Sequence, residues 1–340
     1  MSRAHAKARK PAKEQVTLEF PNNSLLAQLG GPHQKHFVRI EQQLGVRLAS
    51  RGNLVAVEGD AEMRERAAAV LRALYARIEG GETPGLQEVD AELRFAGREE
   101  RGPDGFGTPS IKTAAGRTVR ARSPAQAAYL DLMRTHPLVF GVGPAGTGKT
   151  FLAAAFGAHL LHERRVERIV LSRPALEAGE RLGFLPGDLR EKIDPYLRPL
   201  YDALFETMGE QCMKLIDSGV IEVAPLAFMR GRTLAHSFVI LDEAQNCSSA
   251  QMKMFLTRLG EDARMVVTGD LSQSDLPGGR AEGMEEALSI LADVEGVAIA
   301  RFSDSDVVRH PLVSRIVRAY DQSAKDVSIP SRYRPKEKGA

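Results

Sequence analysis

What this sequence lacks restricts the kind of protein it encodes. Its 340 residues include no tryptophan and only two cysteines, Cys212 and Cys247, neither in a CxxC pair. That argues against a disulfide scaffold and a zinc ribbon, and it fits the reducing cytoplasm. No apolar run approaches the roughly 18 residues of a membrane span. The basic segment 1–13 has no apolar stretch of the kind found in secretory signals.

An excess of one charge is also missing. The 46 Lys and Arg residues nearly balance the 44 Asp and Glu residues, for a net charge of +2. The chain is therefore not a basic nucleic-acid coat, and any nucleic-acid surface must come from local clustering. A hydrophobic content of 43% is typical of a globular protein. At roughly 150 residues per domain, the length predicts about two domains.

The sequence pattern predicts five parts. They are a basic flexible tail (1–15), a small α/β domain (16–80), a linker (81–122), a larger α/β domain (123–325) and a basic C-terminal tail (326–340). The linker is predicted from its many glycines and prolines, which interrupt regular structure. For the N-terminal tail, a solvated arm is the ordinary interpretation, and a phosphate-attracting arm is the alternative.

The small domain has the element order of a known RNA-binding unit. An alternating strand (16–20), two helices, two short strands (46–48 and 54–57) and a final amphipathic helix follow one another. KH-type units have this order and clamp RNA with a GxxG loop between their first two helices. The corresponding loop here (29–35) has two adjacent glycines and no GxxG. RNA binding and protein docking therefore both stay open for this domain.

The larger domain alternates buried strands with helices. Continuous apolar runs lie at 138–142, 168–171, 238–241 and 265–268, and amphipathic segments separate them. Such runs are typical of parallel strands that are buried on both faces. The sequence therefore predicts a parallel sheet covered by helices on both sides.

A phosphate-binding motif follows the first of these strands. Residues 143–150 form a complete GxxxxGK[ST] sequence between a strand and a helix, which is the context that the motif requires. Its backbone N–H groups and the helix N-terminus can surround phosphate oxygens. Lys149 is expected to reach the β- and γ-phosphates of a nucleotide, and the Thr150 hydroxyl to bind Mg²⁺. The motif consists of Gly143, Pro144, Ala145, Gly146, Thr147, Gly148, Lys149 and Thr150.

Two carboxylates follow the apolar strand 238–241. Asp242 is expected to hold Mg²⁺ through water, as the second half of a P-loop site. Glu243 can polarise an attacking water as a general base, which favours hydrolysis over phosphoryl transfer to a small substrate. The alternative is an acidic signal for the helix that is expected to begin near Ser248.

Two glutamines complete the candidate site. Gln273 follows the strand that ends near Thr268, and it could contact the γ-phosphate or the attacking water. A polar loop is the alternative interpretation. Gln126 precedes the P-loop strand, and its amide can donate and accept at once, as an adenine edge requires. An ordinary surface glutamine is the alternative there.

Taken together, these segments resemble the PhoH family of ATPases. The resemblance runs from about Ser123 to Tyr320 and is carried by the segments 143–150, 172–204, 224–233, 238–246, 251–260, 266–277 and 306–320. The small domain is similar to the KH-like extension of the bacterial members. Two stretches depart from the family pattern, Cys247-Ser248-Ser249 and residues 278–283, and both lie beside the nucleotide motifs.

The resemblance implies a RecA-like P-loop core, similar to that of superfamily 1 helicases, which hydrolyses ATP with Mg²⁺. It implies that residues 143–150 bind phosphates and that Asp242 and Glu243 are the metal and water carboxylates. Gln245 then belongs to a DEAQ element and Gln273 to a GDxxQ element. The family is associated with RNA metabolism and with a YbeY-type endoribonuclease, and we expect a cytoplasmic protein.

A single P-loop leaves room for one RecA-like core. The second wall of the nucleotide site must then come from another subunit or be absent. The analogy with other one-core motors and the resemblance to the PhoH family favour a homo-oligomeric ring of six subunits. In such a ring an arginine from a neighbour could stabilise the transition state. The candidate is Arg309, with Arg301 and Arg173 as alternatives. Each of these arginines is equally suited to a surface ion pair.

Two basic stretches are candidates for RNA contact, residues 228–232 and Arg164-Arg165, although the first could equally be an interface loop. The apolar content of 175–204 suggests packing against a neighbouring subunit. The leading functional prediction is an ATP-hydrolysing, RNA-linked motor that acts with an endoribonuclease. The alternatives are a nucleotide-switched scaffold that recruits a ribonuclease, and an RNA-independent ATPase of phosphate or stress physiology.

Overall fold

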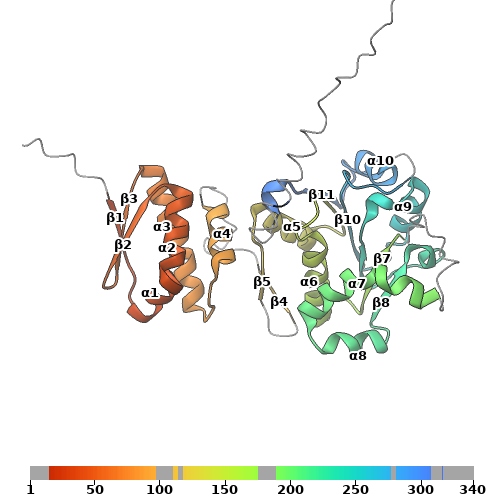
Figure 1. The fold of residues 1–340 in the computed structure, drawn as a ribbon. Coiled ribbons are helices and arrows are strands. Elements are labelled where there is room, and N and C mark those ends of the chain that lie inside the picture. The colour runs from red at the N-terminus through yellow and green to blue at the C-terminus, as the bar shows by residue number, and fades with distance from the viewer. Residues whose placement is uncertain are drawn as a thin grey trace, which may run out of the picture.

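A computed structural model describes residues 15–96, 110–113, 118–174, 189–276, 281–307 and 316. Both predicted tails lie outside these ranges, except for Gln15. So do Arg309 and residues 278–280 of the second departure. Figure 1 shows a small N-terminal unit and a larger unit with helix α4 between them.

The N-terminal unit has the element order that the sequence predicts. It consists of β1 (Gln15–Glu19), α1 (Asn23–Gly30), a 3₁₀ turn (Pro32–Gln34), α2 (Lys35–Leu44), β2 (Arg47–Arg51), β3 (Leu54–Glu58) and α3 (Ala61–Glu79). The strands form an antiparallel sheet in the order β1-β3-β2, and the helices cover one of its faces. The Asp60 side chain caps α3 by accepting the Glu62 N–H at 3.0 Å. The resemblance to a KH-type unit stays an interpretation.

The segment expected as a linker contains regular structure. Helix α4 (Leu86–Phe95) and the antiparallel strands β4 (Ser110–Lys112) and β5 (Thr118–Arg120) lie within it. Val89 of α4 is fully buried in the core of the N-terminal unit, and Ile111 of β4 is buried in the core of the larger unit. The glycines and prolines therefore flank short elements. Apolar burial fixes α4 to the N-terminal unit and β4 to the larger unit.

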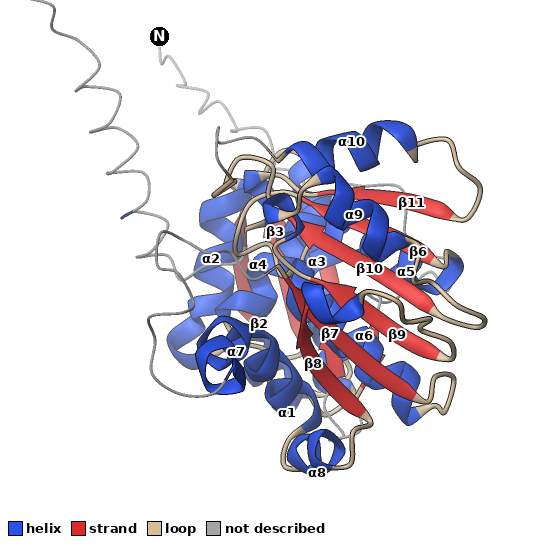
Figure 2. Cartoon of the chain, turned by 90° about the vertical axis from the view of Figure 1, so that its right-hand side faces the viewer, coloured by secondary structure: helices blue, strands red, loops and turns tan. Residues whose placement is uncertain are grey.

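The larger unit is built on six parallel strands. It contains α5 (Pro124–Thr135), β6 (Leu138–Val142), α6 (Lys149–His162), β7 (Arg168–Arg173), α7 (Leu189–Met208), α8 (Gln211–Asp217), β8 (Ile221–Pro225), a 3₁₀ turn (Leu226–Met229), β9 (Ser237–Leu241), a second 3₁₀ turn (Ala244–Asn246), α9 (Ser249–Leu256), β10 (Arg264–Gly269), α10 (Glu282–Ile290), β11 (Val297–Arg301) and a last 3₁₀ turn (Asp304–Asp306). The strand order is β11-β6-β10-β9-β7-β8 (Figure 2). All five neighbouring pairs are parallel, as predicted. The sequence did not predict the two edge strands β8 and β11.

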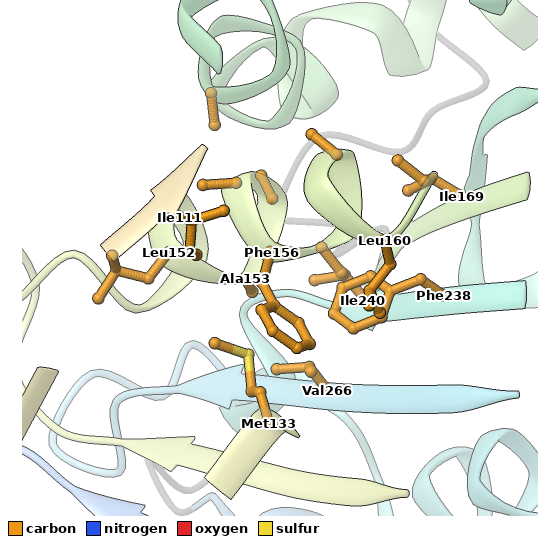
Figure 3. Close-up of a cluster of buried hydrophobic side chains, with 14 of the residues drawn as sticks. Ile111, Met133, Leu152, Ala153, Phe156, Leu160, Ile169, Phe238, Ile240 and Val266 are labelled. Atoms are coloured by element: carbon orange, nitrogen blue, oxygen red, sulfur yellow. The ribbon is translucent and has the colours of Figure 1, made fainter. Parts of the chain in front are cut away.

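Both faces of this sheet are covered by helices. Alternate strand residues such as Phe238, Ile240 and Val266 pack with Phe156 of α6 on one face (Figure 3). Their sequence neighbours, such as Val239 and Leu241, pack with α9 and α10 on the other face. Losing a fully buried phenylalanine side chain such as Phe238 costs about 3–5 kcal/mol. The apolar runs thus determine the position of the sheet in the core. Polar side chains that could take part in chemistry lie at the ends of the strands.

Helix α7 belongs partly to the core of its own chain. Leu200 and Leu204 are fully buried and pack with the residues of α6. The expectation that 175–204 packs against a neighbouring subunit is therefore wrong for these residues, because their apolar side chains already cover the sheet of this chain. Residues 175–188 lie outside the described residues. None of the helices described here combines the length and apolar character that crossing a membrane requires.

Candidate nucleotide-binding site

The P-loop joins the end of β6 to the start of α6. Gly146 and Gly148 have φ angles of 82° and 80°, in the left-handed region that glycine adopts readily. At Gly143 an added Cβ would lie 2.5 Å from the carbonyl oxygen of Phe302, so a side chain does not fit there. Because the strands are parallel, this loop lies at the same sheet edge as the residues that follow β9 and β10.

Lys149 is held inside the P-loop. Its Nζ donates to the carbonyl oxygens of Gly143 and Pro144 at 2.6 and 2.8 Å, and lies 3.3 Å from the Thr147 hydroxyl. The residue is 8% exposed. Burial lowers the pKa of Lys149. The negative charges of Asp270, Asp242 and Glu243 oppose that shift. The ammonium group thus stands between the loop that would hold phosphates and the acids of the neighbouring strands.

Asp242 and Thr150 lie side by side, as the sequence motifs require. The Asp242 Oδ1 accepts the Thr150 hydroxyl at 2.6 Å and the Thr268 hydroxyl at 2.7 Å, and the residue is buried. A hydroxyl and a carboxylate oxygen are ligands that suit Mg²⁺. The described residues contain no cluster of three or more His, Cys, Asp or Glu side chains able to hold a metal. A Mg²⁺ ion on Thr150 and Asp242 would take its other ligands from water and substrate phosphates.

Glu243 has a strained backbone and two side-chain partners. Its φ of 54° is left-handed, which costs a non-glycine residue on the order of 1 kcal/mol. One carboxylate oxygen lies 3.0 Å from the Arg173 guanidinium, and the other accepts the Gln245 amide at 2.5 Å. The side-chain oxygen of Gln245 in turn accepts the Asp270 N–H at 3.1 Å. This chain of contacts joins the ends of β7, β9 and β10.

Gln273 is tied to the neighbouring acid. Its amide donates to Asp270 at 2.7 Å, while the other Asp270 oxygen accepts from the N–H and hydroxyl of Ser272 at 3.0 and 2.7 Å. Gln273 and Asp270 also line a cavity of about 560 Å³ beside Gly143. Contact with a γ-phosphate stays a prediction for Gln273.

The comparisons with known proteins show the family of this chain. The family described as PhoH-like protein matches residues 118–321. This chain belongs to the PhoH family. The PhoH-like protein of Bacillus subtilis (strain 168) is 45% identical over 294 residues, covering 85% of this chain and 92% of that protein. Protein PhoH of Escherichia coli (strain K12) is 47% identical over 205 residues, covering 59% of this chain and 58% of that protein.

Solved structures show more distant likeness to the PhoH-family chain. The large terminase from a thermophilic bacteriophage aligns with a TM-score of 0.38 and 11% identity, covering 57% of this chain and 49% of that one. Pif1 helicase from Candida albicans aligns with a TM-score of 0.33 and 15% identity, covering 64% of this chain and 49% of that one. The predicted α/β fold class is confirmed. The resemblance to the PhoH family is confirmed as well, and the chain is a nucleotide-binding P-loop protein of that family.

Gln126 has contacts that the sequence did not predict. It is 4% exposed, so the interpretation as a surface glutamine is wrong. Its amide donates to the carbonyl oxygen of Thr147 in the P-loop at 2.9 Å, and its side-chain oxygen accepts the Arg122 N–H at 2.6 Å. Both polar groups therefore bind the protein itself and tie the P-loop to the start of α5. An adenine contact stays a prediction.

The three arginine candidates have different positions in this PhoH-family chain. Arg309 lies outside the described residues. Arg301 is exposed at the end of β11 and lines the cavity beside the P-loop. Arg173, at the end of β7, pairs with Glu243. Arg173 and Arg301 thus both lie at the edge of the site.

Thr268 and Asp270 are residues whose part in the site the motifs did not indicate. Both belong to the segment 268–273, in which sequence reasoning singled out only Gln273. Thr268 donates to Asp242, and Asp270 orients Gln273. A hydroxyl near the end of a buried strand is a weak signal by itself, because its partner lies on the neighbouring strand.

Proposed function

We propose that this chain binds and hydrolyses ATP, and that hydrolysis is coupled to RNA in a complex with a YbeY-type endoribonuclease. One observation carries the ATPase part. A buried lysine, a hydroxyl–carboxylate pair and a second carboxylate meet at one sheet edge, around Lys149, Asp242 and Glu243. Family membership supports the same activity.

Each of these groups has a separate task in ATP hydrolysis. Lys149 would exchange its loop carbonyl partners for oxygens of the β- and γ-phosphates. Thr150 and Asp242 would hold Mg²⁺, which when bound neutralises charge on the phosphates. Glu243 would accept a proton from the attacking water, and its Arg173 and Gln245 contacts would orient the carboxylate. Gln273 would contact the γ-phosphate, and its hydrogen bond to Asp270 would position the amide.

An exposed aromatic and an exposed arginine support RNA contact at this same edge. Phe228, in the turn that follows β8, is 52% exposed, and Arg230 is exposed next to it. A base can stack on the ring while the guanidinium binds a phosphate. Arg232 differs from Arg230 because it forms two hydrogen bonds of 2.6 Å with Glu222. We therefore assign the RNA contact to Phe228 and Arg230.

The first experiment is steady-state ATP hydrolysis with and without single-stranded RNA, with Glu243→Gln as the blank. We expect RNA to stimulate turnover, and we expect Phe228→Ala with Arg230→Gln to lower the apparent RNA affinity by about tenfold. A matched control is Lys253→Gln, which removes an exposed charge from α9. Turnover that is indifferent to RNA would overturn the coupling while leaving the ATPase assignment intact.

We further propose that subunits complete each other's sites in a six-membered ring. The cavity beside the P-loop is lined by Arg301 and Asp304 of this chain, and a neighbouring subunit would supply its second wall. An arginine from that neighbour, with Arg309 as the candidate, would stabilise charge in the transition state. Light scattering with a non-hydrolysable ATP analogue should give six times the subunit mass. A monomer that hydrolyses ATP at the full rate would contradict the ring.

A nucleotide-switched scaffold is the second candidate, and one group of contacts favours it. Ion pairs connect Arg120 with Glu82 and, at 3.7 Å, Arg122 with Glu88, so the N-terminal unit contacts the segment that holds Gln126. A change in the P-loop could reach the N-terminal unit through that segment. Endoribonuclease binding that depends on ATP, in a protein whose turnover ignores RNA, would support this candidate. Turnover and partner binding that both ignore RNA would favour an RNA-independent ATPase.

A further inference from the structure

A second cavity lies at the sheet edge opposite the nucleotide site. It has a volume of about 550 Å³ and is bounded by the residues that precede β6, β7, β9 and β10. The polar groups around it are Arg164, Arg165, Glu167, His236, Asp262 and Arg264. Strand β6 has five residues and runs between the two edges, which places the cavity about 16 Å from the P-loop.

In the described part of the chain, none of the three arginines of this cavity forms an ion pair, although Glu167 and Asp262 also line it. Within the described part of the chain, the structure records no ion pair between Arg164, Arg165 or Arg264 and a carboxylate. Arg264 is fixed by donating to the carbonyl oxygens of Met133 and His136 at 3.0 and 3.2 Å. Burial and the nearby charge of Arg165 lower the pKa of Arg264. An anion in the cavity would relieve this repulsion.

The rim of the cavity has a defined backbone structure. Three of its non-glycine residues have left-handed backbones, with φ of 55° for Arg164, 50° for His236 and 50° for Asp262. Hydrogen bonds of 2.8 Å from the Glu167 N–H to the His236 carbonyl, and from the His236 N–H to the Glu261 carbonyl, join loops that are far apart in sequence. Strained conformations of this kind persist where surrounding contacts fix them, often at functional sites.

We propose that this cavity is a second anion site, which binds the phosphate group of an organic phosphate. Guanidinium groups suit phosphate because they present planar pairs of N–H donors. The volume lies within the range of small-molecule pockets, roughly 300–1,000 Å³.

The carboxylates at the rim favour an organic phosphate over a bare ion. Glu167 is exposed there, and Asp262 lies 3.7 Å from the His236 ring nitrogen. Such acceptors can bind the hydroxyl groups of a sugar. The phosphate could belong to a free nucleotide or to the 5′ end of an RNA chain, and the two share this chemistry.

The experiment uses the full chain with Lys149→Ala, so that the P-loop contributes as little as possible. Calorimetric titration with AMP should show binding, and Arg164→Gln with Arg165→Gln should weaken it by about tenfold or more. The matched control, Arg72→Gln with Lys253→Gln, removes two exposed charges elsewhere and should leave the affinity unchanged. Absence of AMP binding, or equal weakening in the control, would overturn the proposal.

Two further measurements complete the test. A single-stranded RNA with a 5′-phosphate, compared with the same RNA carrying a 5′-hydroxyl, separates the two sources. Tighter binding of the phosphorylated RNA that is lost in the arginine variant assigns the RNA end, and equal binding of both assigns the free nucleotide. Arg164→Lys with Arg165→Lys keeps the charge and the fold but removes the paired donors. It should bind AMP more weakly than the parent, and an unchanged affinity would overturn an arginine-specific site.

Discussion

The charged groups at the two edges of the six-stranded sheet differ in whether they have partners within the protein. At the carboxyl edge, Lys149, Asp242 and Glu243 each have partners within the protein. At the amino edge, Arg164 and Arg165 line a cavity and have no recorded carboxylate partner among the described residues. A nucleotide at the carboxyl edge must therefore exchange contacts that already exist, whereas an anion at the amino edge would supply contacts that are absent. The first arrangement suits a switch, and the second suits a static binding site.

Replacing the P-loop lysine should have the largest effect, and should weaken nucleotide binding at the carboxyl edge alone. Lys149→Ala removes the cation that faces the phosphates, and we expect ATP affinity to fall by about 100-fold or more, since hydrogen bonds to charged groups are among the strongest. A fluorescent ATP analogue measures this loss, and AMP binding at the amino edge should remain. Retained ATP affinity would contradict the role given to Lys149.

Replacing the proposed base should leave binding intact at both edges and stop turnover at one. Glu243→Gln keeps the size of the side chain and one acceptor oxygen but cannot take a proton. We expect kcat to fall by about 10²- to 10⁴-fold while ATP stays bound. Single-turnover kinetics and nucleotide binding should be measured on the same sample. A variant that loses ATP binding as severely as Lys149→Ala would show that Glu243 has a structural role.

A smaller effect is expected at Thr268, whose hydroxyl supports Asp242. Thr268→Val keeps the shape but removes one hydrogen bond to a buried carboxylate, which destabilises the fold by about 1.5–3 kcal/mol. The midpoint of thermal unfolding should fall, and more Mg²⁺ should be needed for half-maximal ATPase activity. Thr257→Val is a control, because Thr257 is exposed and lies away from the site. Its hydroxyl donates to backbone carbonyls of α9 and accepts from the neighbouring Arg258. Equal effects of both substitutions would deny Thr268 a specific part in the site.

The smallest effect is expected for the reactivity of the two cysteines, which can be measured without any substitution. Burial raises the pKa of Cys247, which follows β9, to about 12, and that of Cys212, which lies in α8 before β8, to about 11. Since a raised pKa keeps a thiol protonated, both should react slowly with a thiol reagent at pH 8 and faster as the pH rises. ATP should slow the labelling of Cys247 and leave that of Cys212 unchanged. Rapid labelling of both in the folded protein would contradict the burial of these thiols.

Local patterns in the sequence predicted the central strands well and the edges less well. Strand β6 has the predicted bounds, Leu138–Val142, because a continuous apolar run is required where both faces are covered. Strands β8 and β11 were missed, since segments such as Ile221–Pro225 carry a charge that interrupts the apolar run. Edge strands tolerate such sequences because they have one neighbour.

The candidate site shows the same limit. The P-loop and Asp242-Glu243 lie in continuous motifs and could be found from the sequence. The Arg173–Glu243 pair joins residues from β7 and β9, and it depends on a strand order that no local pattern encodes. The cavity at the amino edge requires four separate loops to meet. Its arginines were visible in the sequence, but their shared surroundings were not.

The position of Gln126 makes one backbone amide an internal gauge of the P-loop. The Arg122 N–H is covered by the Gln126 side chain, whose other end holds the Thr147 carbonyl. Deuterium can replace the Arg122 amide hydrogen only when Gln126 releases it, so the exchange rate measures how often this link opens. Nucleotide binding at the P-loop should thus be readable at an amide outside the loop, on the path toward the N-terminal unit.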